Sequence, residues 1–215
     1  VVEDAALDRI ITDDPDKLNR LPGEWQRIDD DILGLQCWAR SVVSQQRRSI
    51  SPAASKITYT SGSTGNPKGV CLSRASMDSV VNSLVGVLQP LAVSRHLSLL
   101  PLSTLLDNLV SVEVAPALGA TVLLPSLSET GIGYGGIDIQ RMLACIDRYS
   151  PESLLLVPEL LRVLVASVAK GWRAPANLKF IAVGGASVSP ELLTAAHAVG
   201  LPAYEGYGLS ECASV

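Results

Sequence analysis

Tyr59-Thr60-Ser61-Gly62-Ser63-Thr64-Gly65-Asn66-Pro67-Lys68-Gly69-Val70 is the stretch of this chain that says most about its fold. Its glycines let the backbone approach a ligand closely, and successive amide N–H groups in such a turn form a concavity for an anion. The serine and threonine hydroxyls add hydrogen-bond donors, and Lys68 adds a positive charge that can follow a phosphate. Because an apolar strand-like run at 57–60 leads directly into it, the stretch is predicted to be a phosphate-binding loop.

Two other interpretations of this loop disagree with its sequence. A Walker A loop places about four residues between a glycine and Gly-Lys-Ser/Thr, whereas Gly65 lies just before Asn66-Pro67-Lys68, and Gly69 follows the lysine. Pro67 also lacks the amide donor that such a cradle needs. A flexible Ser/Gly linker would not have apolar residues fixed on both sides, at 57–59 and at 70–72.

Outward from the loop, short apolar strands alternate with amphipathic helices. Apolar residues at 77, 80, 81, 84, 85 and 88 share one helical face, and Asp138, Pro158 and Ser189 are typical of helix starts. The predicted strands are 57–60, 97–100, 121–124, 154–157 and 180–183. This alternation predicts an α/β fold with mostly parallel β-sheet layers flanked by helices.

The first 56 residues carry a weaker pattern, rich in Asp and Arg, and a short helix is predicted near 32–41. We expect residues 1–90 to end a first α/β subdomain that carries the phosphate loop. Residues 91–215 are expected to form a second α/β subdomain. The start at Val1 suggests a piece of a longer chain.

Composition argues against several classes of protein. Hydrophobic residues make up 47% of the chain, so a packed core is expected. The net charge of −4 without a basic run argues against nucleic acid and anionic membranes. No apolar run is long enough to span a bilayer, and the acidic N-terminus does not resemble a signal peptide. Four scattered cysteines without a C-x-x-C pair favour free thiols and a cytoplasmic location.

Two further glycine-rich stretches follow predicted strands at the carboxyl ends, where ligands bind in open α/β sheets. Gly184-Gly185-Ala186 would let a flat base lie against the backbone, although a tight strand-to-helix connection explains it equally well. In 204–211, Tyr207 between two glycines can present its ring face to adenine. Ser210 can donate to a phosphate oxygen, and Glu211 can hold Mg²⁺. The alternative here is a glycine-rich turn with a solvated glutamate.

The remaining polar candidates are weak. His96 and His197 are the only histidines, and without metal-like spacing both are expected to be structural or exposed. Asp107 and Glu113 show no pattern of an acid/base pair.

Taken together, the motifs resemble the adenylate-forming superfamily, which includes acyl-CoA synthetases, luciferases and peptide-synthetase adenylation domains. The resemblance rests on Tyr59–Val70, Leu100-Pro101-Leu102, Gly184–Leu192 and Tyr207-Gly208-Leu209-Ser210-Glu211, and it runs from about Lys56 to the end of the chain. The amino-acid sequences of the motifs are most similar to those of bacterial long-chain fatty acyl-CoA synthetases.

This resemblance implies an acid–thiol ligase reaction in two steps. A carboxylate attacks the α-phosphorus of ATP to give an acyl-adenylate and pyrophosphate, and a thiol such as coenzyme A then displaces AMP. It implies catalytic roles for Lys68, Ser210 and Glu211, and Mg²⁺ ligation by Thr64 and Glu211. The implied nucleotide-binding residues are Thr60, Ser61, Gly62, Ser63, Thr64, Gly65, Lys68, Gly184, Gly185, Ala186, Glu205, Gly206, Tyr207, Gly208 and Ser210.

The chain departs from the family pattern in three ways. Thr104 stands where the family often has histidine, so the resemblance does not say how access to the acyl site is gated. Ser210 replaces the signature threonine but keeps its hydroxyl. The family's ribose-binding aspartate, hinge and catalytic lysine would lie beyond Val215, in and before a C-terminal lid domain. We therefore expect these 215 residues to be poorly active or inactive alone.

Three kinds of function stay open at this point. Relatives that activate amino acids usually place an aspartate early in the motif at 100–104, and no acid lies between 97 and 106. This favours a fatty or other uncharged-tail carboxylate, with a long-chain fatty acid first. Adenylation of another carboxylate, such as an amino or aryl acid, and a non-catalytic nucleotide-binding module are the alternatives.

Overall fold

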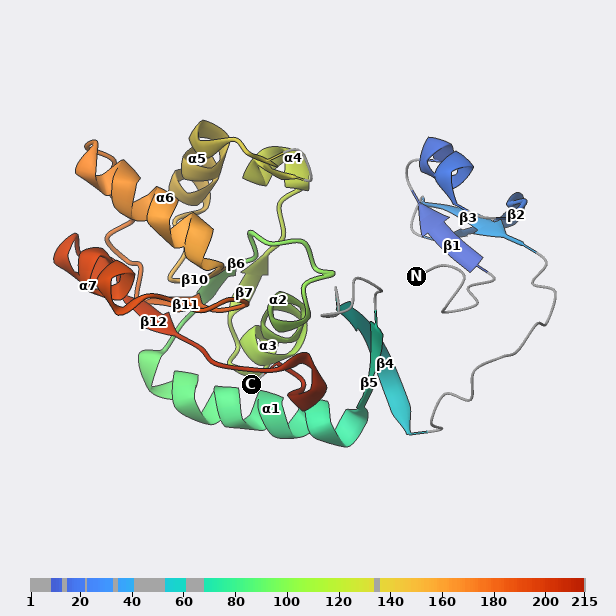
Figure 1. Ribbon diagram of the computed structural model, residues 1–215, viewed down its shortest axis with the longest axis horizontal. Coiled ribbons are helices and arrows are strands. Elements are labelled where there is room, and N and C mark those ends of the chain that lie inside the picture. The colour runs from blue at the N-terminus through green and yellow to red at the C-terminus, as the bar shows by residue number, and fades with distance from the viewer. Residues whose placement is uncertain are drawn as a thin grey trace. The chain divides into compact units, whose positions relative to one another are not determined.

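The computed structural model describes residues 9–12, 15–21, 23–32, 35–40, 53–60, 68–133 and 136–214. The chain divides into two compact units, Val1–Cys71 and Leu72–Val215. The larger unit carries a five-stranded sheet and most of the helices, with a large cluster of buried apolar side chains and a smaller one formed by Val93, Ala115 and Ala120 (Figure 1). None of the helices in the described residues is long and apolar enough to cross a membrane.

The sheet of the larger unit is parallel throughout. Its strands are β6 (Arg95–Leu97), β7 (Thr121–Leu123), β10 (Ser153–Leu156), β11 (Phe180–Val183) and β12 (Ala203–Glu205), in the order β12-β11-β10-β6-β7. The chain thus starts in the middle, adds β7 on one side and then builds outward on the other. This is a doubly wound order whose direction reverses between β6 and β10, where such folds bind ligands. The predicted α/β fold is confirmed.

Helices cover both faces of this sheet. One face packs against α5 (Ile139–Tyr149), α6 (Pro158–Ala169) and α7 (Pro190–Ala198). The other is covered by α1 (Arg74–Leu88) and by a continuous helical run made of α2 (Leu105–Leu109), the π-turn η3 (Val110–Val114) and α3 (Ala115–Ala117) (Figure 1). Smaller elements are η2 (Gln89–Leu91), α4 (Leu127–Thr130), β8 (Ile132–Gly133), β9 (Gly136–Ile137) and η4 (Ser210–Cys212).

The helix starts follow from local chemistry, as the sequence predicted. Asp138 caps α5 by accepting a hydrogen bond from the Arg141 amide, and Ser189 caps α7 in the same way through the Leu192 amide. Pro158 opens α6 at its first position, where its missing N–H costs nothing. Between these helices and the sheet lies the main core, which includes the fully buried Leu97, Leu154, Leu156, Leu161, Leu164, Ile181 and Val183.

Side chains also join the amino ends of the three central strands. The Glu152 carboxylate, just before β10, accepts hydrogen bonds from the Ser94 amide at 2.6 Å and from Lys179 Nζ at 3.0 Å. Lys179 Nζ also donates to the Ala92 carbonyl at 2.7 Å. The hydrogen bonds from Ser94 and Lys179 lower the pKa of Glu152. Strands β6, β10 and β11 are therefore tied together at the edge opposite their carboxyl ends.

The predicted strand at 97–100 is shifted. The observed β6 ends at Leu97, because from Ser98 onward the chain turns away from the sheet. The Ser98 amide still donates to Leu123 O at 3.1 Å, but its hydroxyl donates to Asp107, and Pro101 follows shortly after. Leu100 is nevertheless buried, so the apolar residues at 97–100 indicate a buried segment and not a strand over its whole length.

The smaller unit contains strands where a helix was predicted. β1 (Arg9–Thr12), β2 (Gln26–Ile32) and β3 (Leu35–Ala39) form an antiparallel sheet in the order β1-β3-β2, and η1 (Pro15–Arg20) follows β1. The helix near 32–41 was therefore a wrong prediction. Cys37 is buried in β3 between two less buried neighbours, and pairing of β3 with both β1 and β2 decided the conformation.

Candidate nucleotide and acid site

The carboxyl edge of β11 and β12 brings the two glycine-rich motifs together. Val183 and Glu205 are partners in the parallel register, and the Gly206 amide donates to the Val183 carbonyl at 2.8 Å. A Cβ on Gly184 would lie 3.3 Å from the Gly206 carbonyl oxygen, so glycine permits this close approach. Gly185 has a φ of +81°, a conformation that side chains disfavour. The expectation that these turns share one edge is thus met in the geometry.

Glu205 links the two turns through its side chain. Its Oε1 atom accepts a hydrogen bond from the Val188 amide at 3.3 Å, which connects the end of β12 to the segment after Gly185-Ala186. Behind the edge, the rings of Tyr204 and Phe180 stack at 5.5 Å, and His197 Nε2 donates to the Ala203 carbonyl at 2.7 Å. The turns at this edge are therefore stabilised by main-chain hydrogen bonds and by contacts of side chains on β11, β12 and α7.

The signature that follows β12 is open to solvent. Tyr207 is 82% exposed, so its ring is free to stack on a flat ligand. Ser210 and Glu211 form the start of the short 3₁₀ turn η4, with Ser210 half-buried and Glu211 exposed. Gly208 is exposed between them and Tyr207.

The predicted phosphate loop lies in the sequence between the two strands of a small sheet. Thr60 ends β4 (Ala54–Thr60), and the exposed Lys68 begins β5 (Lys68–Ser73), which pairs with β4. A Cβ on Gly69 would lie 3.0 Å from Ile57 Cγ2, so the strands approach closely there. The predicted binding residues Ser61, Gly62, Ser63, Thr64 and Gly65 lie outside the described residues.

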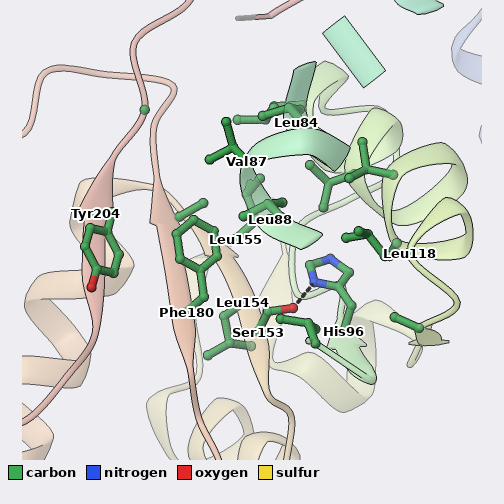
Figure 2. A pocket seen from close by; sticks show the side chains of 18 of the residues that line it. Leu84, Val87, Leu88, His96, Leu118, Ser153, Leu154, Leu155, Phe180 and Tyr204 are labelled. Carbon is green, nitrogen blue, oxygen red and sulfur yellow. Dashed lines mark hydrogen bonds between the residues drawn. The ribbon is translucent and has the colours of Figure 1, made fainter. Parts of the chain in front are cut away.

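An apolar cavity of about 300 Å³ adjoins the carboxyl edge of the larger unit. Its wall combines one face of the sheet with α1 and the run from α2 to α3, and Gly206 belongs to both the cavity and the edge (Figure 2). The side chains that line it include Leu84, Val87, Leu88, Leu106, Val110, Leu118, Leu155, Phe180, Ala182 and Tyr204. Such a small, mostly apolar cavity suits the apolar part of a small ligand.

A buried polar group interrupts this apolar wall. His96 Nδ1 lies 2.9 Å from Ser153 Oγ, and His96 Nε2 lies 3.2 Å from Ser111 Oγ. Figure 2 shows the bond between His96 and Ser153 within the cavity lining. Burial lowers the pKa of His96 to about 4, so the ring is neutral at physiological pH. Of the two expectations for His96, structural or exposed, the structure therefore supports the structural one.

Asp107 is a second buried polar group on the same side of the sheet. It lies on α2, accepts a hydrogen bond from the Ser98 hydroxyl, and is fully buried. Its Oδ1 atom has no hydrogen-bond partner in the described structure. Burial raises the pKa of Asp107 to about 6. The side chain holds the start of α2 to the segment after β6 and does not line the cavity.

Metal-ligating groups are sparse in the described part of the chain. No group of three or more His, Cys, Asp or Glu side chains gathers there. Mg²⁺ bound with a nucleotide commonly uses one or two carboxylates plus phosphate oxygens. The exposed carboxylate of Glu211 fits that requirement, while Thr64, its predicted companion, is not described.

Sequence reasoning named Glu205 and Gly206 of the cavity lining, but as nucleotide-binding residues, and it did not identify the strand residues of the cavity wall. Phe180, Ala182 and Leu155 belong to strands that were predicted, but their side chains face the cavity through the period-two alternation of each strand. His96 was named only as a structural or exposed residue. The signal that was available is the alternation in 180–183, but which face meets α1 depends on the tertiary fold.

Comparison with characterised proteins places this geometry in context. The chain is 31% identical over 162 residues to the indoleacetate–CoA ligase of Aromatoleum aromaticum, covering 72% of this chain and 29% of that protein. It is 31% identical over 168 residues to a PKS-NRPS hybrid synthetase of Aspergillus candidus, covering 77% of this chain and 6% of that protein. The chain thus spans less than a third of the length of either relative.

A solved structure shares the fold. The O-succinylbenzoate coenzyme A synthetase of Bacillus subtilis in complex with AMP superimposes with a TM-score of 0.56 at 24% identity, covering 82% of this chain and 42% of that one. The relatives therefore include CoA ligases and a peptide-synthetase hybrid, and they do not single out the long-chain fatty acyl-CoA synthetases that the motif wording suggested. Residues 5–215 match the AMP-binding enzyme family, and the chain belongs to that family.

Proposed function

We propose that the protein activates a carboxylic acid with ATP, forming an acyl-adenylate and pyrophosphate. The observation that carries this proposal is Gly206, which joins the glycine-rich carboxyl edge to the apolar cavity. A carboxylate whose apolar body occupies the cavity would have its reacting oxygen at this edge, next to a bound nucleotide. Membership of the AMP-binding family supports ATP as the co-substrate.

In this proposal the edge binds and orients the nucleotide. Gly184, Gly185 and Ala186 would offer a flat backbone surface to adenine, with the ring of Tyr207 on its exposed face and Glu205, Gly206 and Gly208 alongside. Ser210 would donate to the α-phosphate. Phosphoryl chemistry depends mainly on positioning and on neutralising developing charge.

The charges come from two places in the sequence. Lys68, with Thr60 and the loop residues Ser61 to Gly65, would follow the β- and γ-phosphates that leave as pyrophosphate. Glu211 and Thr64 would hold Mg²⁺, which supplies charge neutralisation at the phosphates when it is bound. The second step would transfer the acyl group to a thiol, and the CoA ligases among the relatives support coenzyme A as the acceptor.

The cavity favours a compact acid with an uncharged body. Its volume lies at the lower end of the range of about 300–1,000 Å³ typical of small-molecule sites. Among the described lining residues Glu205 is the one carboxylate, and it already accepts a bond from the Val188 amide. An acid with a positively charged body would meet this one carboxylate and otherwise mostly apolar side chains. The long-chain fatty acid inferred from the motif wording is the second candidate.

The test is ATP–pyrophosphate exchange in the protein that carries this chain, with acids from acetate through decanoate to palmitate, arylacetates and amino acids. We expect exchange to peak with compact apolar acids. Lys68→Ala should abolish most of it, while Lys170→Ala, an exposed lysine at the end of α6, should not. A peak at palmitate would favour the fatty acid instead, and ATP binding without exchange for any acid would refute enzymatic activation.

A further inference from the structure

The cavity wall contains one row of side chains in which polar and apolar residues meet. Val122, His96, Ser153 and Phe180 are in register across β7, β6, β10 and β11, so they lie side by side on one face of the sheet. His96 and Ser153 occupy the two strands between which the strand order reverses. Three of these four, His96, Ser153 and Phe180, line the cavity (Figure 2).

A hydrogen-bond count on this row leaves one hydroxyl proton to spare. A neutral imidazole donates from one nitrogen and accepts at the other. Each nitrogen of His96 has one serine as its partner, Ser153 at Nδ1 and Ser111 at Nε2. One serine therefore gives its proton to the ring, and the other receives the ring N–H and keeps its own proton.

The placement of the two serines decides which of them keeps the proton. Ser111 lies in the π-turn η3, is buried, and does not line the cavity, whereas Ser153 does. A spare proton on Ser111 would be buried without an acceptor among the described residues, which is costly. A spare proton on Ser153 faces a cavity where a ligand or a water can accept it. The favoured tautomer therefore carries its proton on Nδ1.

We propose that Ser153, held by His96, is a specificity-determining residue that selects carboxylic acids whose apolar body carries one uncharged hydrogen-bond acceptor, such as a ketone or ether oxygen. This rests on the proposed function, in which the cavity receives the body of the acid. Because the rest of the lining around Ser153 is largely aliphatic or aromatic, an acid without an acceptor leaves this hydroxyl unpaired, and a charged substituent finds no counter-charge beside it.

The test compares acids that differ by one carbonyl. In the protein that carries this chain, kcat/KM for ATP–pyrophosphate exchange is measured with decanoate and with a series of oxodecanoates whose ketone moves along the chain. We expect one position of the ketone to be favoured over decanoate by about threefold to tenfold, the worth of one hydrogen bond. Ser153→Ala should remove this preference, because the hydroxyl that pairs with the ketone is gone.

Two control variants separate the hydroxyl from a general effect on packing. Ser153→Thr keeps the hydroxyl in a strand position and should keep the preference. Ser111→Ala removes the hydroxyl that donates to Nε2 without changing the cavity lining, so it should weaken the preference. The ¹⁵N chemical shifts of His96 give an independent measurement, because they distinguish a proton on Nδ1 from one on Nε2.

Each outcome has a defined meaning. No preferred ketone position, a preference that survives Ser153→Ala, or a proton on Nε2 would overturn the inference while exchange itself upholds the proposed function. If no acid supports exchange, the proposed function fails. The same acid pairs are then compared by calorimetric dissociation constants in wild-type protein and Ser153→Ala, and equal ratios in the two proteins would overturn the inference separately.

Discussion

The carboxyl edge of the sheet and the cavity that adjoins it are built by opposite means. The edge consists of glycine turns joined by main-chain bonds, such as Gly206 N to Val183 O, and its side chains Tyr207 and Glu211 are exposed. The cavity is lined by side chains from helices and strands far apart in the sequence; several of them, such as Leu154, are buried, while Val87 and Tyr204 are exposed. A site of the first kind tolerates changes without loss of fold, whereas each change in the second is also a change in packing.

The largest expected change in activity comes from a substitution of Glu211, an exposed residue at the edge. Glu211→Gln keeps the shape of the side chain but removes its charge, so ATP–pyrophosphate exchange should fall by about 10²–10³-fold, the scale of losing one electrostatic contact to a transition state. The melting temperature should not change, because Glu211 is exposed. Glu191→Gln, an exposed glutamate in the first turn of α7, is the control. Full exchange in Glu211→Gln would remove this residue from the site.

A substitution inside the cavity should change substrate choice instead. Ala182→Leu adds bulk to a lining position, and the fit of a hydrophobic site changes by about 10- to 200-fold per methylene group. We expect kcat/KM to fall for acids with large bodies, with the KM for ATP unchanged. Ala198→Leu, at an exposed position of α7, should leave both unaltered. A raised KM for ATP in Ala182→Leu would mean that edge and cavity are not separable.

Asp107 extends the contrast to stability and pH. Burial raises its pKa to about 6 from 3.8, so the stability it contributes is full below pH 3.8 and is lost as the pH rises through 6. Asp107→Asn removes that loss, and the free energy of unfolding should rise by up to about 3 kcal/mol at pH 8, with little gain at pH 4.

The stability of Asp107→Asn should also depend on pH differently from that of the wild type. Because the pKa of His96 is lowered to about 4, His96 costs stability as the pH falls from 6.5 to 4, and Asp107 offsets this in the wild type. Denaturant melts of Asp107→Asn should therefore show a steeper loss over that range. Asp147→Asn, at an exposed position, is the control, and an unchanged profile in Asp107→Asn would contradict the buried charge.

The smallest expected effects come from alanine substitutions at two glycines, one with close neighbours and one without. At Gly184 a Cβ would lie 3.3 Å from the Gly206 carbonyl, so Gly184→Ala should lower the free energy of unfolding by about 1 kcal/mol and weaken ATP binding. Gly86, inside α1, has no neighbour within 4 Å of an added Cβ. Gly86→Ala should raise stability by about 1 kcal/mol, since alanine favours the helix. Equal signs in thermal melts would contradict the close approach.

The edge was largely predictable from the sequence, because its chemistry lies in contiguous motifs. The caps Asp138 and Ser189, Pro158 at its helix start and the strand 180–183 were all confirmed, since each depends on neighbouring residues. The cavity was not predictable, because His96, Ser153 and Phe180 meet only through strand order and register. The helix predicted near 32–41 failed for the same reason, as pairing with β1 and β2 determined β3.

The ties among Glu152, Ser94 and Lys179 have a consequence for how such a protein can diverge. They fix the alignment of β6, β10 and β11 at the amino ends of the strands, opposite the carboxyl edge, without using any cavity side chain. A gene encoding this fold can therefore accumulate substitutions at positions such as Ala182 or Ser153 while the strands keep their alignment. Under the proposed function, substitutions that change which acid the cavity accepts would leave the alignment of the strands intact.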